Sequence, residues 1–152
     1  MDEEIRILIK GVLGHFVGRR QDFEVERPRC REAVNAMTRA VCEVLEVHRP
    51  KYTEMVSDLG DSFPDAAMVN VAKSLFEDGI INWGRVVSLI CLGAAVCQHQ
   101  DRFSGSPGSL LADTVSEAIA SYLLTEHRGW LEEMCWVSGL YSRGLNFMLS
   151  LL

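Results

Sequence analysis

The side chains that could carry chemistry in this chain are four histidines, five cysteines and one arginine near an expected helix start. His15, His99 and His127 show neither the spacing of a metal site nor that of a catalytic triad. No two cysteines form a Cys-x-x-Cys pair, which argues against a zinc ribbon or a thioredoxin-like centre. We therefore expect no catalytic residue, no metal and no cofactor. An enzyme of unknown type remains an alternative that a deep polar pocket with convergent titratable groups would support.

Arg85 has the most definite chemistry. It lies one turn inside the helix that we expect to begin at Asn82, where the helix dipole favours an anion. A guanidinium binds a carboxylate by two parallel hydrogen bonds, and Gly84 would let a ligand backbone approach closely. The residues alone leave two interpretations open: a carboxylate-binding arginine, or an exposed arginine in solvent. Because an exposed helix start tolerates alanine, we expect Arg85→Ala to leave folding almost unchanged.

The elements that position these residues have the hydrophobic period of α-helices. Pro50 is expected to end or kink the second helical stretch, and Asp78-Gly79 to stop the fourth. No convincing strand pattern and no internal repeat is present. The apolar stripes run through Ile5–Phe16, Val34–Leu45, Tyr52–Leu59, Met68–Phe76 and Leu111–Tyr122, and two shorter helices are expected around Trp130 and Leu140.

The stretch Val86–Cys97 is apolar nearly all round, interrupted only by Ser88 and Gly93. A helix of this kind lies in a domain centre or in a membrane. Its twelve residues are too few to cross a bilayer core of roughly 30 Å at about 1.5 Å per residue. We therefore predict an all-α fold, a single domain over residues 1–152 in which seven to eight helices surround one buried hydrophobic helix.

The composition limits the class of partner. Of the 152 residues, 48% are hydrophobic and 24% are charged, and the formal net charge is −6. This balance is typical of a folded domain and argues against nucleic acid or an anionic membrane as the main partner, because both require basic patches. Free cysteines and an acidic N-terminus predict a reducing, cytoplasmic location without a stable membrane anchor.

Around Arg85 the sequence resembles a known family. The stretch Leu75–Cys97, in which Phe-Glu-Asp-Gly is followed by Asn-Trp-Gly-Arg at the start of the apolar helix, is similar to the first homology region of the Bcl-2 family. The stretch from His127 to Trp136 resembles a shortened second homology region, with tryptophans at positions 130 and 136. The resemblance implies a Bcl-2-like helical bundle that regulates apoptosis.

Two stretches compete for the third homology region (BH3), the death motif of the family. Val56–Phe63 contains Leu-Gly-Asp, but it ends only about twenty residues before Asn82, roughly half the separation that the family fold requires. The spacing places the region instead on Ala33–His48, where Val41 and Cys42 replace the expected Gly-Asp. The resemblance therefore argues against a death ligand that acts through its own second helix, and the Leu-Gly-Asp is expected in a turn or at a helix boundary.

The resemblance also implies a groove that binds the amphipathic BH3 helices of pro-apoptotic proteins, with Arg85 paired to the aspartate of the ligand. Core packing without ligand contact is an equally good interpretation of Val71, Leu75 and Val87. His48 is equally compatible with a surface histidine that has no role in the groove. Trp83 is expected to pack in the interior. Carried across position by position, the ligand-binding residues are Val44, His48, Tyr52, Met55, Val71, Leu75, Asn82, Gly84, Arg85, Val87 and Ser88.

The function implied by the resemblance is inhibition of apoptosis by sequestering pro-death relatives, in the cytoplasm or at mitochondria through partners. The short connection between the first two helices and the lack of a C-terminal anchor are similar to trimmed, virus-encoded relatives. The alternative with the same fold is a pore-forming, pro-apoptotic member. An apolar groove left empty also exposes adhesive surface, so a homodimer is a further alternative.

Overall fold

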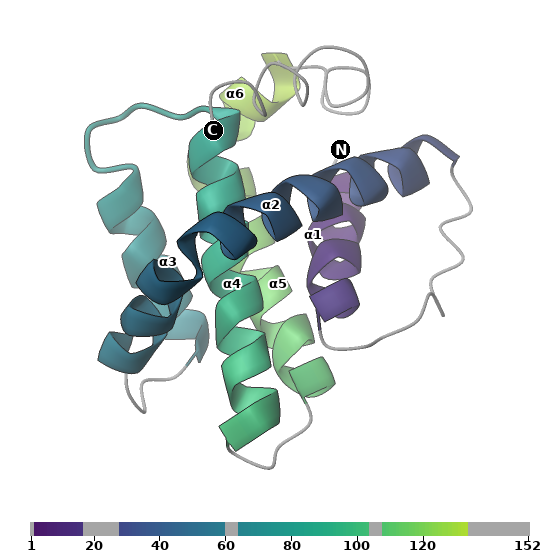
Figure 1. Cartoon of the computed structure of the whole chain (residues 1–152). Coiled ribbons are helices and arrows are strands. Elements are labelled where there is room, and N and C mark those ends of the chain that lie inside the picture. Colours follow the sequence, from purple (N-terminus) through teal and green to yellow (C-terminus); the bar gives the residue numbers. More distant parts are fainter. Residues whose placement is uncertain (1, 17–27, 60–63, 104–107, 134–152) are drawn as a thin grey trace.

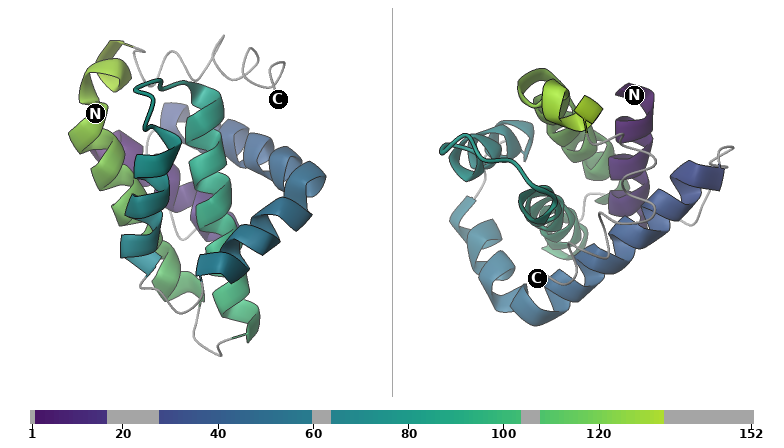
Figure 2. Two further views of the ribbon diagram at one scale, coloured as in Figure 1. Left: turned by 90° about the vertical axis from the view of Figure 1, so that its left-hand side faces the viewer. Right: turned by 90° about the horizontal axis from the view of Figure 1, so that it is seen from above.

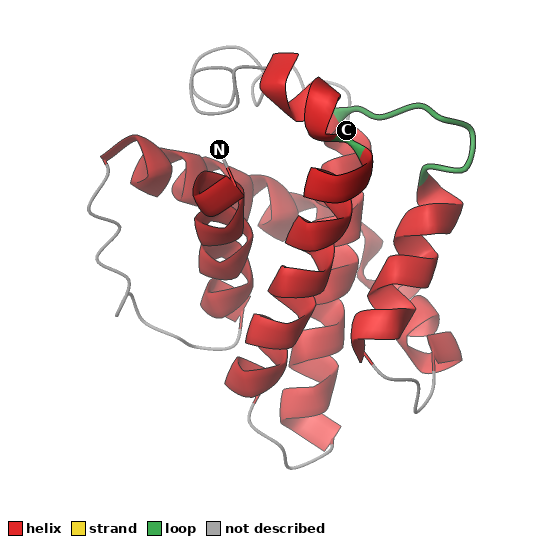
Figure 3. Cartoon of the chain, turned by 180° about the vertical axis from the view of Figure 1, so that it is seen from behind, coloured by secondary structure: helices red, strands yellow, loops and turns green. Residues whose placement is uncertain are grey.

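The described part of the protein, in this computed structural model, comprises residues 2–16, 28–59, 64–103 and 108–133. Within these ranges the chain forms helices and no strand, as Figure 3 shows, so the predicted all-α fold is confirmed. The helices are α1 (Asp2–Phe16), α2 (Pro28–Leu59), α3 (Pro64–Leu75), α4 (Trp83–Phe103), α5 (Gly108–Glu126) and α6 (Arg128–Glu133). The Leu-Gly-Asp turn expected at residues 59–61 and the tryptophan at position 136 fall largely or wholly outside the described residues.

The long helix α2 consists of two limbs that meet at a kink. His48 has non-helical backbone angles, φ −113° and ψ 22°. Pro50 follows two residues later; it lacks an N–H, and its ring clashes with the carbonyl of the preceding turn. The predicted kink is confirmed, and residues 28–47 and 49–59 are called the first and second limbs below. Figure 2 shows α4 lying inside the angle between the two limbs.

The apolar helix α4 lies at the centre of the fold. Helices α1, α2, α3 and α5 all pack against it (Figure 1). From Val86 to Cys97 every residue is buried except Ser88 and Ala95. The predicted central helix is therefore confirmed. Ser88 and Ala95 are seven residues apart, which is about two turns, so they lie on one side of α4, and each is only partly covered, whereas Cys91 and Leu92 between them are buried.

Helix α5 runs beside α4 and closes the core on the other side. At Gly93 an added Cβ would lie 3.0 Å from Ile119 Cδ1 and 3.0 Å from Val115 Cγ1. The two helices therefore approach each other more closely here than a larger residue would allow. Among the described residues no helix combines the length and the apolarity that crossing a bilayer requires.

The connection between α3 and α4 positions the residues of the candidate site. Gly79 has φ +78°, a left-handed conformation that glycine adopts without a Cβ penalty, and its N–H donates to Phe76 O at 2.9 Å. At the other end of the connection, Asn82 Oδ1 accepts the backbone N–H of Arg85 at 2.9 Å. The predicted glycine stop and asparagine N-cap are both confirmed. They hold residues 76–85 in a defined course between the two helices.

Candidate functional site

The guanidinium of Arg85 joins the end of α3 to the start of α4. Its Nη1 donates to Leu75 O at 3.1 Å, to Ile80 O at 2.9 Å and to Asp78 Oδ1 at 2.5 Å. Its Nη2 donates to Asp78 Oδ2 at 2.8 Å. Asp78 and Arg85 therefore form a bidentate ion pair, the geometry in which a guanidinium binds a carboxylate most strongly.

This pair shifts the titration of both partners. The hydrogen bonds from the Arg85 guanidinium, followed by the one from the Ile80 amide, lower the pKa of the Asp78 carboxyl to about 2. The hydrogen bond to Asp78 in turn raises the pKa of Arg85. Both groups thus stay charged over the whole physiological range, and the positive charge of Arg85 is already compensated from within the chain.

Of the two interpretations that the residues left open, an arginine exposed in solvent does not fit the structure. The Arg85 side chain is only 28% exposed and makes four hydrogen bonds, two of them to backbone carbonyls of the α3–α4 connection. Replacing it with alanine removes all four, so an unchanged folding stability is no longer expected. The sequence does not predict these hydrogen bonds, because their acceptors belong to a turn whose path depends on how α3 and α4 pack.

Asp78 is a site residue that the motif around Arg85 does not include. The Asp78-Gly79 pair predicts a helix stop, and this prediction gives the carboxylate no partner. The usable signal was an acidic side chain in the turn that leads into the helix carrying the arginine. Its Oδ1 also accepts the Ile80 N–H at 3.0 Å, so the turn itself holds the carboxylate in place.

Beside Arg85, the first two turns of α4 carry a short partly exposed stripe formed by Gly84, Arg85 and Ser88. Ser88, one turn further on, lies 3.1 Å from the hydroxyl of Tyr52 on the second limb of α2. Gly84 is partly exposed, and an added Cβ there would lie 3.3 Å from Asn82 Oδ1. Small side chains on this stripe leave the surface of α4 open, and a bulkier residue at Gly84 would crowd the cap.

Partly exposed apolar residues of two further elements flank this stripe. Met55 on the second limb, and Val71 and Leu75 on α3, pack against the core while keeping some exposed surface. Val71 and Leu75 are one turn apart on α3, and the carbonyl of Leu75 binds Arg85. We call this surface the α2–α3–α4 face; it consists of Met55, Val71, Leu75, Gly84, Arg85 and Ser88.

The other predicted site residues lie elsewhere or are covered. Val87 is fully buried, which agrees with core packing for this residue, and Val44 and Tyr52 are only 7% and 4% exposed. His48 is exposed at the kink, and Asn82 is exposed while its side chain caps α4. Contact of any of these residues with a ligand remains a prediction.

Trp83 and Cys91 both lie in the interior. Trp83 is 9% exposed and packs edge-on against Trp130, with ring centroids 4.8 Å apart, so its predicted packing role is confirmed. Burial raises the pKa of the Cys91 thiol to about 12, and its Sγ lies 3.9 Å from Val41 O. A thiol with that pKa is inert at neutral pH and fills space as a small apolar side chain.

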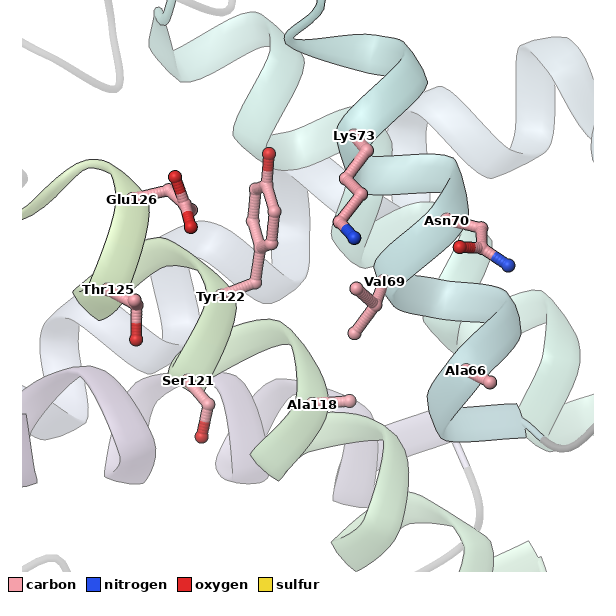
Figure 4. A pocket seen from close by; sticks show the side chains of 9 residues that line it. All are labelled: Ala66, Val69, Asn70, Lys73, Ala118, Ser121, Tyr122, Thr125 and Glu126. Carbon is pink, nitrogen blue, oxygen red and sulfur yellow. The ribbon is translucent and has the colours of Figure 1, made fainter.

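A cavity of about 510 Å³ lies away from this face, between α3 and α5. Figure 4 shows Lys73 on the α3 wall and Glu126 on the α5 wall, with Tyr122 between them. None of the predicted ligand-binding residues lines this cavity. Among the described residues no group of three or more His, Cys, Asp or Glu side chains is placed to hold a metal ion.

Comparison with known proteins identifies related sequences. The family model described as "Apoptosis regulator proteins, Bcl-2 family" matches residues 37–134. The curated protein "Apoptosis regulator R1" of Xenopus laevis is 31% identical over 102 residues, which are 64% of this chain. The match covers 42% of that relative, so the chain spans about two fifths of its length.

Comparison with solved structures finds the same fold in a zebrafish protein. The crystal structure of the zebrafish pro-survival protein NRZ in complex with the Bad BH3 matches with a TM-score of 0.79 and 25% identity, over 96% of this chain and 93% of that one. The apo form of NRZ matches with a TM-score of 0.75 and 26% identity, over 98% and 93% of the two chains.

Proposed function

The chain belongs to the Bcl-2 family of apoptosis regulators, and we propose that it is a survival-type member that captures the BH3 helices of pro-apoptotic proteins on its α2–α3–α4 face. One observation carries the proposal: partly exposed apolar side chains of α2 and α3 flank a stripe of α4 that presents small residues and one arginine. The likeness to NRZ, a pro-survival protein solved with a BH3 bound, supports this choice.

The chemistry of the face suits an amphipathic helix. Such a ligand requires an apolar surface for its buried side and a polar group that fixes its register. Met55, Val71 and Leu75 supply apolar surface, and Ser88 adds a small, partly exposed side chain on α4. Arg85 supplies the charge, for which an acidic residue of the ligand is the matching partner.

The alternative is a pro-apoptotic member that forms pores. A member that acts through its own death motif must expose the apolar side of its second helix. Here Met37, Ala40 and Val41 on that helix are fully buried, and Val44 is 7% exposed. Releasing the helix would expose all four side chains, at a cost of roughly 1.5–3 kcal/mol for each large one. The survival-type assignment is supported instead by Val41 and Cys42, which stand where a death motif is expected to carry Gly-Asp.

The test is a panel of synthetic BH3 peptides titrated by fluorescence anisotropy, together with a liposome-leakage assay. We expect saturable binding of at least one peptide and no leakage from liposomes of mitochondrial lipid composition. Leakage stimulated by a BH3 peptide would favour the pore-forming alternative, and failure to bind any peptide would refute the proposed ligand class.

A matched pair of variants on α3 locates the binding surface. Val71 belongs to the α2–α3–α4 face, whereas Val69, two residues away, lines the cavity between α3 and α5. We expect Val71→Glu to weaken peptide binding about tenfold or more, because a carboxylate would be desolvated under the ligand. Val69→Glu should bind as the wild type does. The reverse result would move the binding surface to the α3–α5 side.

A further inference from the structure

One edge of the Arg85 guanidinium is unused. A guanidinium offers two edges to carboxylates, one formed by Nη1 and Nη2 and the other by Nε and Nη2. Asp78 occupies the first edge, and the carbonyls of Leu75 and Ile80 share Nη1 with it. Among the described residues, nothing accepts a hydrogen bond from Nε, and Nη2 binds only Asp78 Oδ2.

Solvent reaches this unused edge. Within the described part of the chain, the only buried side-chain nitrogen or oxygen without a hydrogen-bond partner is His127 Nε2. Arg85 Nε has no partner either, so it is not buried, and the side chain as a whole is 28% exposed. The Nε–Nη2 edge therefore carries a pair of parallel N–H donors that no described residue uses, and a carboxylate bound there would not displace Asp78.

The carboxylate that orients Arg85 is itself held by backbone. Asp78 Oδ1 accepts the Ile80 N–H at 3.0 Å. The turn that carries it is closed by the Gly79 N–H to Phe76 O bond and by the left-handed conformation of Gly79. The direction of the guanidinium is thus determined by backbone geometry before any ligand arrives, and a ligand need not order a flexible arginine.

We propose that Asp78 is a positioning residue for ligand recognition. It holds Arg85 by the Nη1–Nη2 edge and presents the Nε–Nη2 edge to an acidic side chain of the bound helix, so that the two carboxylates share one guanidinium. The inference rests on the proposed function, because it assumes that a helix with an acidic residue docks on this face. A residue that merely competed with the ligand for Arg85 would have the opposite effect on affinity.

The experiment measures binding of one BH3 peptide and of its Asp→Ala version to wild type, Asp78→Ala, Asp78→Asn and Glu77→Ala. We expect Asp78→Ala to weaken binding of the acidic peptide about 3- to 10-fold, which corresponds to the net contribution of one hydrogen bond. The same variant should weaken binding of the Asp→Ala peptide by less than about twofold. Asp78→Asn keeps an acceptor for the turn and should fall between Asp78→Ala and wild type. Glu77→Ala changes the net charge equally in the same turn, and should change neither affinity by more than about twofold.

The outcomes distinguish a positioning role of Asp78 from competition with the ligand and from a purely structural role. Tighter binding of the acidic peptide by Asp78→Ala would make Asp78 a competitor and overturn the positioning role. Equal losses for both peptides would mean that Asp78 acts only on the structure of the α3–α4 connection, and would also overturn it. If wild type binds neither peptide, the proposed function itself fails, and the inference fails with it. Should Asp78→Ala not fold, as judged by circular dichroism, the same comparison made with Asp78→Asn decides the question.

Discussion

Arg85→Ala tests the candidate site most directly, because this side chain combines a proposed role with an observed one. In the proposed role its Nε–Nη2 edge binds an acidic side chain of the ligand. In the structure it ties the carbonyls of Leu75 and Ile80 to the start of α4. Alanine removes both the binding edge and these two hydrogen bonds. The variant should therefore bind the acidic peptide more weakly and also unfold at a lower urea concentration than wild type. Arg85→Lys keeps the charge without the planar fork and should be intermediate for binding.

The exposure of the side chain determines the expected size of the binding effect. Fully exposed ion pairs change affinity by only about 1.5- to 5-fold, whereas buried, hydrogen-bonded charge pairs change it by about 30-fold or more. At 28% exposure Arg85 lies between these limits, and its charge is already compensated by Asp78. We therefore expect Arg85→Ala to raise the dissociation constant about 10- to 100-fold.

The assay is a double-mutant cycle read by fluorescence anisotropy. Arg85→Ala and the Asp→Ala change in the peptide should each cost a similar factor, and together they should cost much less than the product of the two. The matched control is Arg39→Ala, an exposed arginine on the first limb of α2. Independent effects of the two changes, or binding by Arg85→Ala within twofold of wild type, would refute the anchor role of Arg85.

Two further predictions concern stability. Leu89 is fully buried in α4, so Leu89→Ala should lower the free energy of unfolding by about 2–5 kcal/mol, measured by urea unfolding followed by circular dichroism. The control is Val47→Ala at a side chain that is 72% exposed, which should cost less than about 0.5 kcal/mol. A loss at Leu89 as small as that at Val47 would contradict a central α4. His127 packs against Phe76 and Tyr122 with Nε2 buried and unpartnered, and burial lowers its pKa from the ordinary 6.5. The pKa of His127 is lower in the folded protein than in the unfolded one, so the neutral imidazole is favoured by folding. The stability that the neutral side chain contributes is therefore fully present above about pH 6.5 and is lost as the pH falls towards the folded pKa. Thermal unfolding of wild type and His127→Phe across this range should show the difference, and identical pH profiles would rule out this role of His127.

The sequence alone determined the features that depend on neighbouring residues. The glycine stop after Asp78, the Asn82 cap and the kink before Pro50 each arise from backbone geometry within about one helical turn. The central position of α4 was also predictable, because a helix that is apolar all round and too short for a bilayer can only be stable in a domain interior. The Bcl-2-like motif around Arg85 could also be identified from the sequence, because its residues form one continuous stretch of the chain.

The tertiary structure alone decided which residues stay accessible. Val71 and Leu75 keep exposed surface while Val87 keeps none, although all three are apolar residues on amphipathic or apolar helices. Exposure depends on where other helices end and bend, and this involves residues far apart in the chain. The pairing of Asp78 with Arg85 is an intermediate case. The two residues are only seven apart, so the sequence brings them near each other, but their side chains meet only because the packing of α3 against α4 brings the turn back over the first turn of α4.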